Sequence, residues 1–247
     1  MSTRSQFPLR RLRRALGATA LGLLGFAAGA QAQEKFTFMT NWYAQAEHGG
    51  FYQALATGLY KKHGLDVNIR MGGPQVNILQ IMAAGQTDCI MGATDTQMMV
   101  SRNNGLPIVT VAAVFQKDPQ VLIAHEQVKS FEDMKDKTIL IAPTAMRGYW
   151  SWLKGKYGVK DSQVRPYTYN IQPFVADKNI VQMGYLSSEP YAIQKQGIKA
   201  NTFLLADHGY PPYANTVSCM DKTVKERRKA VSAFVRASAE GWKAYLA

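Results

Sequence analysis

Three side chains near the start of the chain could hold a flat or polar molecule. Trp42 and Tyr43 follow an alternating pattern over 36–39 that predicts a strand, so both lie where that strand ends. An indole offers a wide stacking face and one N–H donor, and a phenol offers a ring and a hydroxyl. His48 stands at the start of the next helical pattern, where it could donate or accept a hydrogen bond. We predict that all three contact a ligand; the alternatives are a core tryptophan and a histidine with a capping role.

Four more residues are candidates for polar contacts with a bound molecule. Thr94 and Asp95 follow a short buried strand at a helix start, where they could bond a ligand or simply cap the helix. Asn170 ends a strand and could bond the polar edge of a ring. Tyr149 belongs to an aromatic helix, and it is the member of that helix that we expect to face a ligand.

Glu189 is the strongest candidate for recognising a ligand by charge. It lies between a strand end and a helix start in the segment 185–191, Tyr-Leu-Ser-Ser-Glu-Pro-Tyr. A carboxylate there could accept a charge-assisted hydrogen bond from an ammonium or an aminopyrimidine, worth about 1.5–3 kcal/mol. The alternative is a glutamate that only caps the helix before Pro190.

The two cysteines do not form a recognisable metal or redox motif. Cys89 and Cys219 lie too far apart for a zinc ribbon or a CxxC pair, and both stand in apolar, strand-like surroundings. We expect two buried thiols that pack as small hydrophobic groups, although a disulfide remains the alternative. We predict no metal, no cofactor and no catalytic residue.

Residues 1–32 have the layout of a secretory signal peptide. Five arginines precede an apolar run over 15–28, and Ala30-Gln31-Ala32 supplies a small-x-small cleavage site. The alternative is a membrane anchor, but the run is shorter than the about 20 residues that a spanning helix needs. We therefore expect a protein exported to the periplasm.

The positive charge of the chain does not indicate a nucleic-acid-binding protein. The net charge is +12, from 29 basic and 17 acidic side chains; without the five arginines of the predicted signal it is 24 − 17, or +7. The remaining basic residues are scattered, whereas nucleic-acid binding concentrates them on one face. We expect no nucleic-acid partner.

Strand and helix patterns alternate along the rest of the chain, which indicates an α/β fold with parallel neighbouring strands. Strands are predicted at 36–39, 65–71, 89–92, 108–115, 121–124, 138–142, 164–169, 185–187, 202–206 and 215–220. Helical patterns are predicted at 49–63, 76–85, 94–104, 130–134, 145–157, 172–183, 189–196 and 224–246. The alternation restarts in the middle of the chain, so we expect two α/β lobes with a cleft between them, a place where ligands bind.

The segment 41–52, Asn-Trp-Tyr-Ala-Gln-Ala-Glu-His-Gly-Gly-Phe-Tyr, resembles a signature of the NMT1/THI5-like substrate-binding proteins. These are relatives of the taurine, alkanesulfonate and nitrate binding proteins of ABC importers. The later stretches 58–67, 83–88 and 105–109 are similar to further motifs of the same family. The resemblance extends from Phe36 to about Met220.

The resemblance implies a type II periplasmic-binding fold with a hinge and an interlobe cleft. Lobe 1 is then expected at 33–125 and 209–247, and lobe 2 at 126–208. Such proteins usually carry further helices beyond the position of Ala247, so the chain is a candidate for truncation. The implied partners are a small-molecule ligand and an ABC permease with its ATPase, and we expect a monomer.

From these residues we predict capture, not conversion, of a heteroaromatic or amine-bearing solute, for example a thiamin-precursor pyrimidine. A sulfonate, taurine or nitrate ligand is the alternative, and a sensory role stays open beside transport. Some family members are pyrimidine-forming enzymes that use a lysine, a histidine and a cysteine-rich stretch. The matching positions here are Thr94, Met98 and 211–213, without the amine that a Schiff base requires. We therefore expect no enzyme.

Overall fold

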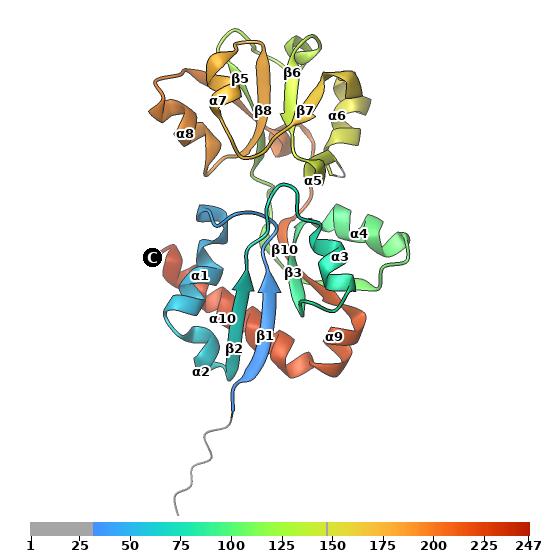
Figure 1. Ribbon diagram of the computed structural model, residues 1–247, viewed down its shortest axis with the longest axis vertical. Coiled ribbons are helices and arrows are strands. Elements are labelled where there is room, and N and C mark those ends of the chain that lie inside the picture. The colour runs from blue at the N-terminus through green and yellow to red at the C-terminus, as the bar shows by residue number, and fades with distance from the viewer. Residues whose placement is uncertain (1–31, 147) are drawn as a thin grey trace, which may run out of the picture. The chain divides into compact units, whose positions relative to one another are not determined.

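The computed structural model describes residues 32–146 and 148–247. The predicted signal peptide lies outside the described residues, except for its last residue, Ala32. From Ala32 onward, leaving out residue 147, no helix is long and apolar enough to cross a membrane. The strands form two separate five-stranded sheets, each with helices packed against it (Figure 1). We call the two halves lobe 1 and lobe 2.

The sheet of lobe 1 has the strand order β2-β1-β3-β10-β4. Strand β1 pairs in parallel with β2 and β3, whereas β10 runs antiparallel to both β3 and β4. The prediction of parallel neighbouring strands is therefore wrong for β10, the strand that the chain forms after it returns from lobe 2. The strands are β1 (Glu34–Met39), β2 (Leu65–Arg70), β3 (Cys89–Thr94), β4 (Ile108–Phe115) and β10 (Ala214–Met220).

The helices of lobe 1 bury two separate hydrophobic clusters on its sheet. One cluster joins the strands to α1, α2 and α10 through stacked aromatic rings, including Phe36, Phe51 and Phe234. The other joins Met39 and neighbouring strand residues to α3 and α4. The helices are α1 (Gly49–Ala56), α2 (Leu59–Lys62), α3 (Ile78–Ala83), α4 (Asp95–Asn103), α9 (Asp221–Glu226) and α10 (Arg228–Tyr245).

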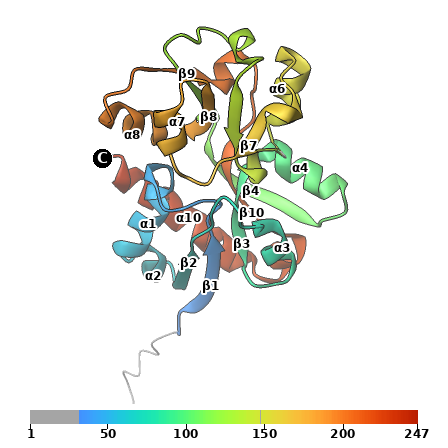
Figure 2. The same cartoon turned by 45° about the horizontal axis from the view of Figure 1, so that its top comes forward.

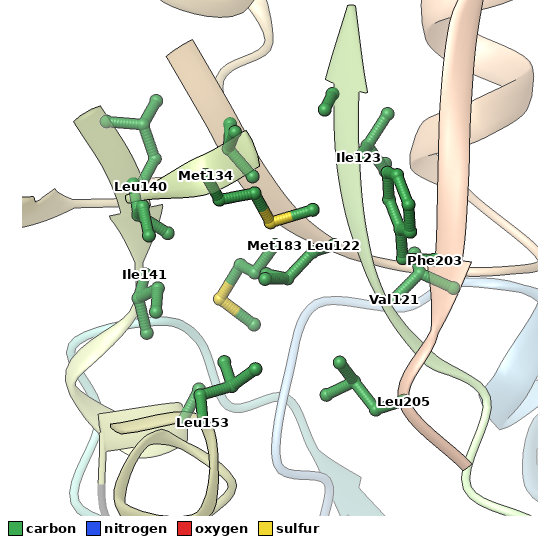
Figure 3. Packing of buried hydrophobic residues seen from close by; sticks show 14 of the residues in the cluster. Val121, Leu122, Ile123, Met134, Leu140, Ile141, Leu153, Met183, Phe203 and Leu205 are labelled. Atoms are coloured by element: carbon green, nitrogen blue, oxygen red, sulfur yellow. The ribbon is translucent and has the colours of Figure 1, made fainter. Parts of the chain in front are cut away.

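The sheet of lobe 2 has the strand order β7-β6-β8-β5-β9. One large cluster of buried residues fills this lobe, and Leu122 of β5 lies beside its registered neighbour Met183 of β8 (Figure 3). The strands are β5 (Gln120–His125), β6 (Thr138–Ile141), β7 (Val164–Pro166), β8 (Ile180–Tyr185) and β9 (Ala200–Leu204). Figure 2 shows α6 at one side of this sheet and α7 and α8 at the other. The helices are α5 (Pro143–Met146), α6 (Trp150–Tyr157), α7 (Gln172–Ala176) and α8 (Glu189–Lys195).

The crossover from lobe 1 to lobe 2 comes earlier than 125, the lobe boundary expected from the sequence. Strand β5 pairs with β8 and β9, so residues 120–125 lie in lobe 2. The chain therefore passes between the lobes at 116–119. It returns after β9 through the 3-10 turn η4 (Leu205–His208) and Gly209, close to the expected position.

The helix predicted at 172–183 is wrong in its second half. Helix α7 ends at Ala176, and the Asp177 side chain accepts a hydrogen bond from the Asn179 backbone N–H in a turn. Residues 180–185 then form β8, which lies between β5 and β6 and is almost entirely buried. A strand covered on both faces shows a continuous apolar run instead of alternation, and such a run does not distinguish strand from helix.

Other long helical patterns are divided in the structure. The pattern at 49–63 is split by Gly58, whose φ of 74° lies in the left-handed region and ends α1 before α2 begins. The pattern at 224–246 belongs to two helices, α9 and α10, which meet at Arg227. Hydrophobic periodicity continues across such breaks because the same face still packs on the sheet.

Cys89 and Cys219 form a disulfide, which corrects the expectation of two free thiols. The two residues are registered neighbours on the antiparallel strands β3 and β10, and both are fully buried. They are 130 positions apart in sequence. Their pairing depends on β10 entering the sheet beside β3, which neither cysteine's local sequence indicates.

Candidate functional site

A cavity of about 60 Å³ lies where the two lobes meet. It is bordered by strand ends and helix starts, the position at which α/β sheets bind ligands. Lobe 1 contributes the loop after β1, the start of α3, the α4 end of β3 and the start of β10. Lobe 2 contributes the start of β5, helix α5, the end of β8 and the start of α8. The polar and aromatic residues around it are Asn41, Trp42, Gln45, Glu47, His48, Asn77, Gln97, Gln120, Thr144, Tyr185, Glu189 and Asn215.

Trp42 lies at the cavity with its ring held by tyrosines. Its indole stacks on the ring of Tyr167 with an interplanar angle of 11° and a centroid distance of 6.3 Å. The edges of Tyr43 and Tyr169 contact it from other directions. Tyr167 is buried and its hydroxyl donates to Glu189 Oε1 over 2.9 Å. Tyr167 and Tyr169 belong to lobe 2, so these ring contacts join the two lobes and orient the indole while the lobes are together.

His48 is neutral and bonded on both ring nitrogens. Its Nδ1 accepts from the Gln45 backbone N–H, so Nε2 carries the proton and donates to Asn41 Oδ1 over 3.2 Å. Burial lowers the pKa of His48 to about 4, because the charged imidazolium would lose its hydration. His48 therefore holds the loop after β1 in shape and keeps Asn41 oriented.

Asn215 ties this loop to the opposite lobe. Its Oδ1 accepts from Asn41 Nδ2 over 3.3 Å and from the Tyr185 hydroxyl over 3.2 Å. Its Nδ2 donates to the Glu47 carbonyl oxygen over 3.2 Å. The residue is 1% exposed and has a φ of 48°, a left-handed conformation that asparagine tolerates better than most residues.

Glu189 is the buried carboxylate of the lobe 2 wall. Its Oε2 accepts from the Tyr185 backbone N–H over 2.8 Å, and its Oε1 accepts from Tyr167. Burial raises the pKa of Glu189, and these hydrogen bonds oppose the rise. Two ionised carboxyl oxygens offer about four lone-pair directions. The backbone N–H of Glu189 itself and the Ser188 hydroxyl also bond this carboxylate, so four protein donors hold Glu189 where it lines the cavity.

A second carboxylate, Glu47 of lobe 1, also lines the cavity. It is 4% exposed, and Ser187 donates to its Oε2 over 2.9 Å. Burial raises the pKa of Glu47, and the neighbouring charge of Glu189 adds to the rise. Among the described residues that line the cavity there is no lysine or arginine to balance these two acids.

Polar contacts also join the lobes beside the cavity. The side-chain amide of Gln45, just before the 3-10 turn η1 (Ala46–His48), donates to the Tyr169 hydroxyl over 3.0 Å and to Ser188 Oγ. With the bond between Ser187 and Glu47, the segment 45–48 thus contacts three residues of lobe 2. These bonds border the cavity on the side of α8.

Three of the eight sequence-predicted site residues line the cavity: Trp42, His48 and Glu189. Tyr43 lies beside them, partly exposed and in contact with Trp42 and Tyr169, but does not line the cavity. Thr94 caps α4 by accepting from the Gln97 backbone N–H, and the cavity is lined instead by Gln97. The role of the sequence-predicted residues in ligand binding stays a prediction.

The remaining three predicted residues lie away from the cavity lining. Asp95 bonds the backbone N–H of Thr96 at the surface. Asn170 is exposed and accepts from the Gln172 backbone N–H, which starts α7. Tyr149 is fully buried in the lobe 2 core, against Tyr210. Each of these side chains thus contacts a partner within its own lobe.

None of the other polar lining residues was predicted from the sequence. Asn41, Gln45 and Glu47 stand inside the segment 41–52 that carried the family resemblance, so proximity to Trp42 could have indicated them. Asn215 and Gln120 have no local signal, because they reach the cavity only through the pairing of distant strands.

The described part of the chain contains no group of three or more His, Cys, Asp or Glu side chains placed to hold a metal ion. The lining residues instead provide hydrogen-bond acceptors, amides and one indole. Such a set can stack on a ring and bond its polar edges.

Two curated proteins with related sequences are named as small-molecule-binding proteins. The riboflavin-binding protein RibY of Chloroflexus aurantiacus is 26% identical over 217 residues, which cover 84% of this chain and 61% of that protein. The formylaminopyrimidine-binding protein of Halalkalibacterium halodurans is 22% identical over 224 residues, covering 87% of this chain and 68% of that one. The chain thus spans about three fifths to two thirds of the length of these relatives.

Solved structures share the fold. The periplasmic aliphatic sulphonate binding protein SsuA from Escherichia coli matches with a TM-score of 0.59 and 14% identity, covering 83% of this chain and 73% of SsuA. A second match is a Candida albicans protein described as having the generic periplasmic binding protein fold, with a TM-score of 0.64 and 13% identity. This match covers 86% of this chain and 71% of the Candida albicans chain. These likenesses confirm the predicted fold class of two α/β lobes.

A sequence profile of the NMT1/THI5-like family matches residues 45–247, most of the chain. The match includes lining residues of both lobes, from Gln45 and Glu47 to Glu189 and Asn215. With its motifs, its two-lobed fold and its interlobe cavity, the chain belongs to the NMT1/THI5-like family of substrate-binding proteins.

Proposed function

We propose that this protein captures a small heteroaromatic or amine-bearing solute in the periplasm and delivers it to an ABC importer. The observation that carries the proposal is Glu189, a buried carboxylate that lines the same cavity as the indole of Trp42. A flat ring that stacks on Trp42 could present N–H donors to Glu189.

The charge of the cavity supports a ligand that donates hydrogen bonds. Glu47 and Glu189 are both removed from water, and an uncompensated buried carboxylate is costly. A ligand ammonium or amino group offsets that cost through charge-assisted bonds of about 1.5–3 kcal/mol. A sulfonate or nitrate would add negative charge beside the same two acids, so the carboxylates favour the first ligand class.

The size of the cavity supports binding by movement of the lobes. A volume of about 60 Å³ holds only a few water molecules, whereas ordinary ligand pockets measure about 300–1,000 Å³. The lobes must therefore separate to admit a solute and close again around it. Two lobes joined by two crossovers are suited to such a hinge.

The names of the relatives agree with this ligand class. Riboflavin and formylaminopyrimidine, the ligands named for the two curated relatives, both contain flat nitrogen heterocycles. We propose that the ligand of this chain shares that chemistry and that no reaction follows its capture.

Calorimetric titration of the purified protein with a matched panel tests the proposal. The panel contains a formylaminopyrimidine, riboflavin, taurine and an alkanesulfonate. We expect heat of binding from a pyrimidine or flavin and none from the two sulfonates. Tight binding of a sulfonate with no response to either heterocycle would refute the proposed ligand class. Conversion of a bound heterocycle, followed by mass spectrometry, would refute simple capture.

Transport is tested in cells of the source organism. Deletion of the gene is expected to abolish uptake of the labelled ligand, and restoring the gene is expected to recover it. Unchanged uptake together with an altered transcriptional response to the ligand would assign the protein to sensing instead. Fractionation with an antibody is expected to place the protein in the periplasm.

A further inference from the structure

Asn215 stands at the junction of two sets of hydrogen bonds that cross between the lobes. One set is its own bond with the Tyr185 hydroxyl of lobe 2. The other set joins Gln45 and Glu47 of lobe 1 to the segment 187–188 and to Tyr169. Inside lobe 1, Asn215 connects to the second set through the Glu47 carbonyl and through Asn41, which bonds His48.

These bonds form one continuous network. From the Gln45 backbone N–H it runs to His48, then to Asn41, then to Asn215, and across to Tyr185. The Tyr185 backbone N–H donates in turn to Glu189. A single chain of contacts therefore connects the shape of the 45–48 turn to the position of the Glu189 carboxylate.

The Asn215 side chain makes three hydrogen bonds, and the one with Tyr185 can form only while the lobes are together. With Tyr185 in place, Oδ1 has two donors and Nδ2 has one acceptor, in a side chain that is 1% exposed. Separation of the lobes removes one of the two donors. The left-handed φ of 48° also has an energetic cost that surrounding contacts must offset.

We propose that Asn215 is a positioning residue that couples closure of the lobes to assembly of the binding site. When Tyr185 reaches Asn215, the amide holds Asn41 and the 45–48 turn in the arrangement that lets Gln45 and Glu47 bond lobe 2. The two sets of interlobe contacts then form together instead of independently. This coupling rests on the proposed function, capture by lobe closure, and adds the residue that sets its cooperativity.

The test measures the distance between the lobes without any ligand. Spin labels at Lys61→Cys in lobe 1 and Lys178→Cys in lobe 2, both exposed positions, report open and closed molecules by pulsed electron resonance. Tyr185→Phe removes only the hydroxyl that crosses to Asn215. Asn215→Gly removes the amide, and glycine accepts the left-handed φ at that position. Tyr157→Phe, a tyrosine of α6 away from the cavity, is the matched control.

We expect Tyr185→Phe and Asn215→Gly each to lower the ratio of closed to open molecules by about two- to tenfold, as expected for one hydrogen bond. The double variant is expected to behave like Asn215→Gly alone, and Tyr157→Phe like the parent. An unchanged distance distribution in Tyr185→Phe overturns the proposal, and so do additive effects of the two changes. Should Asn215→Gly fail to fold, Tyr185→Phe with its control decides the matter.

The same variants separate this inference from the proposed function. Suppose that the parent binds none of the tested solutes, but Tyr185→Phe and Asn215→Gly shift the interlobe distance as expected. The coupling then stands and the ligand assignment fails. If the parent binds a heterocycle but the distance does not respond to Tyr185→Phe, the ligand assignment stands and the coupling fails.

Discussion

The two lobes contribute differently to the cavity. In lobe 1 the polar groups of Asn41, His48 and Asn215 bond mainly one another, and a disulfide fastens the strands behind them. In lobe 2, the carboxylate of Glu189 accepts from Tyr167 and from the Tyr185 backbone N–H, both residues of the same lobe. The difference indicates that lobe 1 supplies a hydrogen-bonded amide and imidazole network, the indole and one carboxylate, Glu47, and that lobe 2 supplies a second carboxylate, Glu189, held by its own backbone and tyrosine.

Removing the disulfide of lobe 1 is expected to have the largest effect. The bridge closes a segment of 130 positions, so the variant Cys89→Ala/Cys219→Ala should lose about 2–5 kcal/mol of unfolding free energy. Denaturant unfolding of the variant and of the oxidised and reduced parent measures the loss. Equal stability of the oxidised and reduced parent would show that lobe 1 does not depend on the bridge.

Glu189→Gln is expected to weaken ligand binding by about 1.5–3 kcal/mol, roughly ten- to a hundredfold. The amide keeps the size of the side chain and loses the charge, so the fold should remain. Titration with the best heterocycle of the panel measures the loss, and unfolding curves check stability. An affinity within twofold of the parent would assign selectivity to another residue.

The buried imidazole of His48 in lobe 1 predicts a specific dependence of folding stability on pH. The pKa of His48 in the folded protein is about 4, below its ordinary value of 6.5, so the unfolded chain takes up the proton first as the pH falls. The contribution of His48 to the free energy of unfolding is therefore complete above about pH 6.5. It is lower by about 2 kcal/mol at about pH 5. His48→Gln, which does not titrate and can still donate to Asn41, should lack this component. An identical pH profile for both proteins would contradict the assignment.

The smallest expected effect tests how closely Glu189 is held. A methyl group at Gly184 would lie 2.9 Å from both Glu189 Cβ and Ile123 Cδ1, so Gly184→Ala must displace the glutamate. We expect affinity to fall by about three- to tenfold, with the charge unchanged. Gly155→Ala is the control, because nothing lies within 4 Å of the added atom. Equal affinities for the two variants would mean that the position of Glu189 tolerates movement.

The sequence predicted the strand segments of lobe 1 well, because 36–39, 65–71 and 108–115 have clear apolar patterns that the sheet then buries. It failed at 180–185, where a strand buried on both faces lacks alternation, and at the disulfide, which depends on a distant strand. For the site, Trp42 and His48 in the distinctive segment 41–52 were predicted and line the cavity, and so does Glu189, which was predicted from its place between a strand end and a helix start. Asn215 and Gln120 could not be predicted from the sequence, because only the pairing of distant strands brings them to the cavity.

The central place of β10 in its sheet also bears on how the chain folds. The strands of lobe 2 are consecutive in sequence from 120 to 204, so that lobe can be completed from its own segment. Lobe 1 lacks the strand between β3 and β4 until residues 214–220 have been made, and the bond between Thr110 and Ser218 spans 108 positions. Contacts so remote in sequence form slowly. The lobe that leaves the ribosome first is therefore the one that finishes folding last.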